Sequence, residues 1–180
     1  MRYSIHFFGM DAAAVAQRLR HEPDAIAEAV VARMTAAGAP TEQDLVYSRQ
    51  FAKNICAGTF SAEDTADEIN TLCWMCEDLA EKIDIPEFNL FRSLDYLEDI
   101  GVWPLFQLEK PPFPVPGSRE ALPQVGYLSR SAIERHTADE FAVLPSCNDP
   151  EAEDARDDLL GIMESLRDDQ LDLLAVLVEV

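Results

Sequence analysis

Two cysteines, Cys73 and Cys76, stand in the motif Cys73-Trp74-Met75-Cys76, which is the closest that this sequence comes to a redox or zinc motif. A redox C-x-x-C lies at a helix N-terminus, where the helix dipole lowers the thiol pKa. Here both cysteines fall in the middle of a predicted helix, on its apolar stripe. A zinc site needs a second pair of ligands, and the sequence has no second C-x-x-C and no H-x-x-x-H. We therefore interpret both as reduced thiols that pack in the core, as buried cysteines commonly do.

Other candidate metal ligands also lack the spacing that metals require. The three histidines, His6, His21 and His136, lie far apart, so only the fold could bring them together. Residues 149–154 imitate the start of an EF-hand loop, but Asp154 replaces its turn glycine, and a leucine replaces the bidentate glutamate at the twelfth position. No G-x-S-x-G or phosphate-binding glycine loop is present. We expect no metal and no cofactor, and we assign no catalytic residue.

The elements that must position these residues are mostly helices. Residues 3–10 are rich in aromatic and β-branched types and predict a strand. Helices are expected after Asp11, from Pro23 to Gly38, from Thr41 toward Gly58, from Ser61 to Ile83, over 88–100, from Ser131 (as part of a capping box with Glu134) to about Phe141, and from Pro150 to about Leu166. The helix from Ser61 has the clearest apolar stripe, which repeats at i, i+3, i+4 and i+7.

The second half of the chain contains a proline-rich segment between two further elements. Residues 104–123 hold six of the 11 prolines, so they predict an extended crossing, packed on its own domain through Phe113 and Val115. Alternatively this segment is a ligand for an aromatic groove on another protein. Residues 125–128 predict a short strand. The apolar run 171–178 predicts a strand buried on both faces, although it could extend the last helix instead.

Together these elements predict an α+β fold: a mostly helical single domain, residues 1–180, with a small sheet that pairs the N- and C-terminal strands. The order of elements, the Pro-Val-Pro stretch and the segment Pro123-Gln124-Val125-Gly126-Tyr127-Leu128 resemble a family of uncharacterised bacterial proteins, a domain of unknown function, chiefly in the C-terminal half. The resemblance implies bacterial origin and a shared fold, and it carries over no activity.

The chain is strongly acidic, with 34 acidic and 14 basic residues and a net charge of −20. Nucleic acids and anionic membranes need a surplus of lysine and arginine, so we expect neither as a partner. The N-terminal apolar stretch is too short for a signal peptide, and no apolar run approaches the ~20 residues of a membrane helix. We expect a cytoplasmic protein. The sequence leaves the oligomeric state open.

The acidity is concentrated in two segments. Residues 61–100 carry 12 acidic and two basic residues, and residues 149–172 carry 10 acidic and two basic residues. On the predicted helices these acids lie opposite the apolar stripes, and Trp74 falls among the acids of the first. The candidate partner-binding residues are Trp74, Asp67, Glu77, Asp78, Glu81, Asp154, Asp157 and Asp158.

Two functional hypotheses remain. In the first, the protein is a non-enzymatic binding module of the inhibitor or immunity type, and its acidic faces dock a basic protein partner. In the second, it is a small enzyme or ligand-binding domain whose site is built from scattered residues near Tyr127, His136 and the proline-rich segment. In a third interpretation, the acidic faces have no binding role and only keep the protein soluble, and a neighbouring element covers Trp74.

Overall fold

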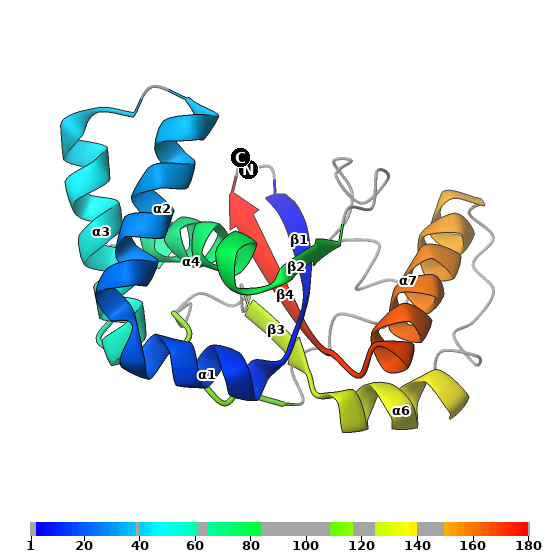
Figure 1. Cartoon of the computed structure of the whole chain (residues 1–180). Helices are drawn as coiled ribbons and strands as arrows, with labels where there is room; N and C mark the ends of the chain where they lie inside the picture. Colours follow the sequence, from blue (N-terminus) through cyan, green and yellow to red (C-terminus); the bar gives the residue numbers. More distant parts are fainter. Residues whose placement is uncertain are drawn as a thin grey trace.

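The first and last strands of the chain pair directly, as the sequence predicts (Figure 1). This computed structural model describes residues 3–38, 40–60, 65–83, 109–116, 125–139 and 150–179. The strands are β1 (Tyr3–Met10), β2 (Glu81–Ile83), β3 (Val125–Leu128) and β4 (Asp172–Glu179). They form an antiparallel sheet in the order β2-β1-β4-β3. The predicted α+β class is confirmed.

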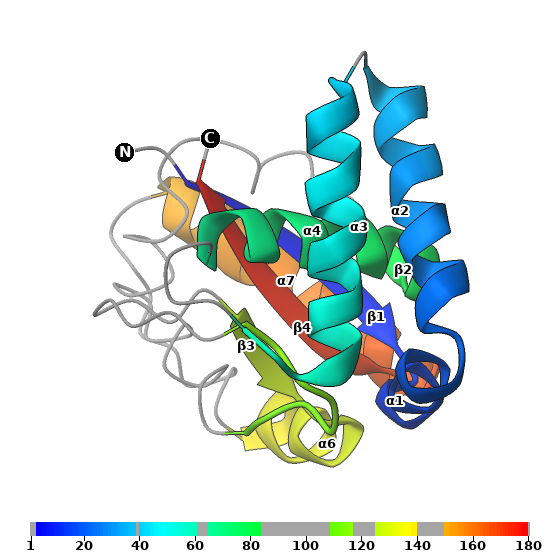
Figure 2. The ribbon, with the colours of Figure 1, turned by 90° about the vertical axis from the view of Figure 1, so that its left-hand side faces the viewer.

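The sheet is covered by helices on both faces (Figure 2). The helices are α1 (Ala12–His21), α2 (Pro23–Ala37), α3 (Glu42–Ala57), α4 (Thr65–Leu79), α6 (Arg130–Asp139) and α7 (Pro150–Asp168). Phe8, Met10 and Leu174 share one core with α1 to α4, whereas α7 lies behind the sheet with α6 against it. Because both faces are covered, β4 is buried from Asp172 to Leu177, which explains its continuous apolar run.

Two local predictions were wrong. The helix expected from Ser61 was predicted to reach Ile83, but α4 (Thr65–Leu79) ends at Leu79 and Glu81–Ile83 form β2 against the edge of β1. Pairing with β1 therefore overrides the helical periodicity of these residues. The expected cap of α6 was Ser131, yet Ala132 N–H donates to the hydroxyl of Ser129 at 3.2 Å. The helix expected over 88–100 lies outside the described residues.

The proline-rich segment is described over residues 109–116, where it is neither helix nor strand, as predicted. Phe113 is buried in the core cluster, and Val115 packs partly against it. Glu109 fixes the segment to the corner between β3 and α6, because its carboxylate accepts a 2.8 Å hydrogen bond from Ser129 N–H. This part of the segment therefore packs on its own domain.

Gly58, at the C-terminal end of α3, packs against Pro114 of the proline-rich segment, and this contact can be tested. This glycine ends α3 in the left-handed conformation, with φ of 69°, and a Cβ added there would lie 3.2 Å from Pro114 Cγ. Replacing Gly58 with alanine should therefore lower the free energy of unfolding by about 1–2 kcal/mol in urea titrations. Gly38→Ala is the matched control, because Gly38 is extended and has open space around it, so its change should stay within about 0.5 kcal/mol. Equal effects of the two substitutions would contradict the described contact.

Candidate functional site

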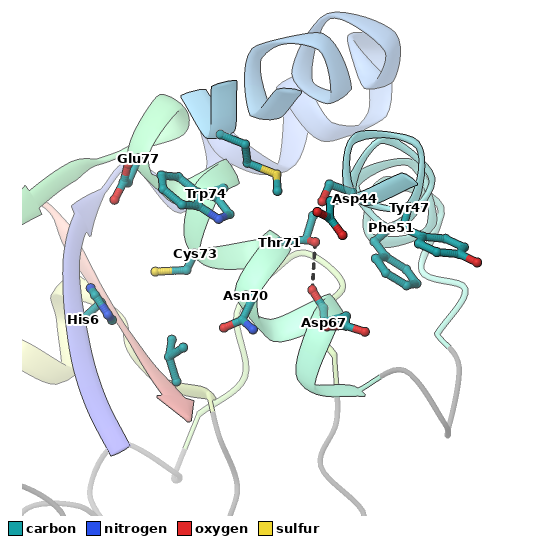
Figure 3. A pocket seen from close by; sticks show the side chains of 13 residues that line it. His6, Asp44, Tyr47, Phe51, Asp67, Asn70, Thr71, Cys73, Trp74 and Glu77 are labelled. Atoms are coloured by element: carbon teal, nitrogen blue, oxygen red, sulfur yellow. Dashed lines mark hydrogen bonds between the residues drawn. The ribbon is translucent and has the colours of Figure 1, made fainter. Parts of the chain in front are cut away.

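A groove of about 410 Å³ runs along the outer face of α4 (Figure 3). Its floor is a single helical stripe, spaced i, i+3, i+4, i+7 and i+10, formed by Asp67, Asn70, Thr71, Trp74 and Glu77. At a rise of about 1.5 Å per residue, this stripe is roughly 15 Å long. Trp74 is partly buried: its ring packs against the core cluster and also lines the groove.

Two walls flank this floor. Helix α3 supplies the first wall from one of its own stripes, formed by Asp44, Tyr47, Ser48 and Phe51. The sheet supplies the second wall through His6 of β1 and Val178 of β4. Figure 3 shows α4 between these walls, with Asp44, Tyr47 and Phe51 on one side and His6 on the other. The groove therefore depends on the packing of α3 and the sheet against the two sides of α4.

The groove is acidic. Among its described lining residues are three carboxylates, from Asp44, Asp67 and Glu77, and no lysine or arginine. Glu77 is partly compensated from outside the groove, because Arg33 Nη1 of α2 lies 3.6 Å from its Oε2. Within the described parts of the chain, no lysine or arginine pairs with Asp44 or Asp67. Negative charge is thus least compensated on the α3 side.

Asp44 is held in place by the cap of α3. Its Oδ2 accepts hydrogen bonds from the backbone N–H of Thr41 at 2.9 Å and from the Thr41 hydroxyl at 2.8 Å. The Thr41 hydroxyl, and then its N–H, hold the pKa of the Asp44 carboxyl below its ordinary value. Since these bonds complete a capping box, the carboxylate that lines the groove is both oriented and ionised.

Aromatic rings complete the lining. Tyr47 is 52% exposed, and its ring stacks on Phe51 with 6.2 Å between centroids. Gln43 Nε2 donates to the Tyr47 hydroxyl at 3.2 Å, which also restrains this side chain. With Trp74 on the floor, the groove presents aromatic surfaces beside carboxylates. Chemically, that arrangement suits a cation with an apolar stem or a delocalised charge.

The predicted partner-binding residues divide between this groove and other places. Trp74, Asp67 and Glu77 line it, whereas Asp78 points to α1 and α2, where it pairs with Arg18 at 3.4 Å and Arg33 at 3.9 Å. Glu81 lies in β2 opposite Gly9, not on the predicted helix. Whether these residues bind a partner stays a prediction.

The second acidic segment does not extend this surface. Asp154, Asp157 and Asp158 lie on α7 as predicted, although their side chains are outside what the structure describes. Because α7 covers the opposite face of the sheet from α4, the two acidic helices do not form one continuous surface (Figures 1 and 2).

Sequence reasoning missed the α3 wall and misjudged one acid on α4. Glu68 was expected on the solvated face, yet it is fully buried. The physical reason is that α4 packs against α2, α3 and the sheet together, so its buried arc is wider than its apolar stripe. For α3, the available sequence signal was the aromatic pair Tyr47 and Phe51, whose i, i+4 spacing puts both rings on one face of a helix.

The cysteine motif packs in the core, as interpreted. Cys73 and Cys76 are buried in the C-terminal half of α4, where Cys73 also lines the groove, and burial raises the pKa of the Cys76 thiol well above its ordinary value. Burial also raises the pKa of Cys56 to about 11. A nucleophilic or redox thiol needs the opposite shift.

Alkylation measures this directly. At pH 8 roughly 0.1% of Cys56 would be thiolate, and Cys76 is only 3% exposed, so iodoacetamide should modify these two thiols at least about 100-fold more slowly in the native protein than in guanidinium. Cys73 is 9% exposed and lines the groove, so its protection should be smaller. Peptide mass spectrometry follows each cysteine separately. Native modification of Cys73 or Cys76 at the unfolded rate would contradict their placement in the core.

The other candidate sites gain little support. His6 lines the groove, His21 is exposed, and the side chain of His136 lies outside the described set. Among the described residues, no group of three or more histidine, cysteine, aspartate or glutamate side chains could hold a metal. Tyr127 is buried in the core cluster, and burial, with the nearby charges of Asp172 and Glu109, raises the pKa of its phenol. None of the helices described is long and apolar enough to cross a membrane.

Fold and groove together define an acidic α+β domain with an aromatic, carboxylate-lined groove over α4. Residues 1–174 match the family described as Domain of unknown function (DUF7691), and the chain belongs to that family. The match extends over almost the whole chain, so the predicted membership in such a family is confirmed. No curated protein and no solved structure matches this chain.

Proposed function

We propose that this protein is a non-enzymatic binding module that engages a basic protein partner through the groove along α4. The observation that carries the proposal is Trp74 on the floor of a groove whose described lining includes three carboxylates and no lysine or arginine. Tryptophan is the residue type most enriched among interface hot spots, and a partly buried ring held by the core loses little conformational freedom on binding.

The charge of the whole chain supports the same conclusion. A net charge of −20 attracts a basic partner over distances beyond direct contact, so it raises the association rate. The carboxylates in the groove then orient the partner at short range. Such a module fits the role of a cytoplasmic inhibitor or immunity-type protein that covers the basic surface of an enzyme, for example a nuclease.

Matched charge reversals test this proposal. Asp67→Arg and Glu164→Arg each replace an exposed helical acid, one in the groove on α4 and the other on α7, which lies across the sheet. Immobilised wild-type protein and both variants are used to capture proteins from a lysate of the native host at about 50 mM salt. We expect a protein of high isoelectric point to be retained by the wild type and by Glu164→Arg, and lost with Asp67→Arg.

The matched design separates a specific partner from general ionic capture. Both variants change the net charge by the same amount, so basic proteins held only by the overall field will respond equally to them. Equal retention by all three proteins, or no basic protein retained by the wild type, would count against the proposal. Circular dichroism of the variants checks that each keeps the helical fold.

A further inference from the structure

We propose, on the basis of the function proposed above, that the α3 side of the groove receives one arginine side chain of the basic partner. Its guanidinium pairs with the carboxylate of Asp67 beside the rim that Tyr47 forms, Asp44 adds a second negative charge, and its aliphatic stem lies along the floor toward Trp74. Uncompensated negative charge, the aromatic surface available there and the size of the groove each favour this occupant.

Charge selects the α3 side. On the sheet side, Glu77 already faces Arg33 at 3.6 Å, so a further cation gains less there. On the α3 side, the Asp67 carboxylate is exposed, and among the described residues its hydrogen bond is the one that its backbone carbonyl accepts from the Thr71 hydroxyl at 2.8 Å. Asp44 uses Oδ2 for the helix cap, which leaves Oδ1 able to accept. Two carboxylates can therefore accept hydrogen bonds from a cation there.

The aromatic lining selects arginine over lysine. A guanidinium is planar, is weakly hydrated and stacks on aromatic faces while its edges donate to carboxylates. A lysine ammonium is a strongly hydrated point charge and uses such a surface less well. Tyr47 is exposed, yet it is restrained by its stacking on Phe51 and by the hydrogen bond from Gln43, so it offers a face already in place.

The size of the groove limits the occupant. A volume of about 410 Å³ lies at the low end of the range for pockets that hold small molecules. It has room for one long side chain and parts of its neighbours. It has no room for a whole helix, which is about 10–12 Å across with its side chains. An arginine presented from a loop or from the end of an element is the occupant that meets all three conditions.

The indole N–H signal of Trp74 reports on this site directly. The chain has two tryptophans, so a ¹⁵N-labelled sample gives two indole cross-peaks, and Trp103→Phe identifies the one from Trp74. Acetyl-Gly-Arg-Gly-amide should shift the Trp74 peak of the wild-type protein saturably, with a dissociation constant on the order of 1–10 mM. The citrulline peptide, which has nearly the same shape and no charge, should bind at least about 10-fold more weakly. The lysine peptide should bind about 3-fold more weakly.

Two variants locate the binding. Asp67→Asn should weaken binding of the arginine peptide about 5-fold, while Glu164→Gln, on α7, should leave it unchanged. The inference is overturned if the citrulline or lysine peptide binds as tightly as the arginine peptide, if Asp67→Asn has no effect, or if the Trp74 peak does not move.

The failure of this inference differs from a failure of the proposed function. If Asp67→Arg abolishes capture of a basic protein but the peptides show no preference for arginine, the binding module stands and the arginine anchor is wrong. If the arginine peptide binds as expected but no basic protein is captured, the chemistry of the groove stands and the proposed partner class is wrong.

Discussion

Replacing Asp172 with alanine should lower the free energy of unfolding by about 3–5 kcal/mol, because it leaves buried backbone donors without an acceptor. Asp172 is the first residue of β4, and only 5% of its surface is exposed. Its Oδ2 accepts from Ala12 N–H at 2.9 Å, and its Oδ1 accepts from Arg130 N–H at 2.8 Å. One buried carboxylate thus binds the first N–H of both α1 and α6.

The expected size follows from what the two helices lose. The first four N–H groups of a helix have no partner within the helix, and a buried N–H without an acceptor costs about 1–3 kcal/mol. At α1, Asp11 Oδ1 accepts from Ala13 and Ala14, and Asp11 O accepts from Val15, so Asp172 supplies the only acceptor for Ala12 among the described residues. The carboxylate also complements the positive ends of two helix dipoles.

Two companion variants make the test specific. Asp172→Asn keeps one acceptor of similar shape and should cost about 2–3 kcal/mol, less than alanine. Asp11→Ala removes an exposed cap from the same helix and should cost about 1 kcal/mol. Urea unfolding followed by circular dichroism measures all three. A loss below 1 kcal/mol for Asp172→Ala would contradict the double-capping role.

The second large effect concerns affinity. For a basic protein captured as described above, Asp67→Arg should raise the dissociation constant at least about 30-fold. The substitution replaces a carboxylate that would pair with a cation of the partner by a positive charge that repels it. Trp74→Phe, which keeps most of the contact with the core, should raise the dissociation constant about 10-fold. Titration calorimetry at two salt concentrations measures both variants.

Salt dependence distinguishes the two substitutions. The loss caused by Asp67→Arg should shrink between 50 mM and 500 mM salt, since surface charge interactions are screened over a few ångströms at high ionic strength. The loss caused by Trp74→Phe should persist, because it comes from apolar and aromatic contact. Glu164→Arg should change affinity less than about 3-fold. If Glu164→Arg weakens binding as strongly as Asp67→Arg, the binding surface is not the groove.

Most of the fold could be predicted where a local signal decides the structure. β1 was placed at its observed bounds, Thr41 and Asp44 predicted the cap of α3, and the apolar run of β4 predicted a strand covered on both faces. Predictions failed where contacts with residues distant in the sequence decide the secondary structure. The residues of β2 continue a helical pattern, and only the open edge of β1 makes them a strand.

The candidate site could be predicted in part for the same reason. The helical spacing of α4 placed Trp74 among acids, and that single helix supplies the floor of the groove. The walls come from α3 and the sheet. The spacing of residues along the sequence does not show that these elements pack against α4. A net charge counted from the sequence also does not distinguish exposed acids from buried or paired ones. Asp172 and Glu68 are buried, and Asp78 pairs with Arg18, so the net charge of a segment overstates the acids that are available to a partner.

Site-specific photo-crosslinking in living cells tests the central claim most directly. Tyr47 forms the rim of the groove, is 52% exposed, and can be replaced by benzoylphenylalanine, with Glu164 on α7 as the matched control position. We expect irradiation to join a basic protein to the chain from position 47 and not from position 164. Addition of Asp67→Arg to the position 47 variant should abolish the crosslink. A crosslink from position 164 alone, or one from position 47 that survives Asp67→Arg, would contradict the groove as the binding site.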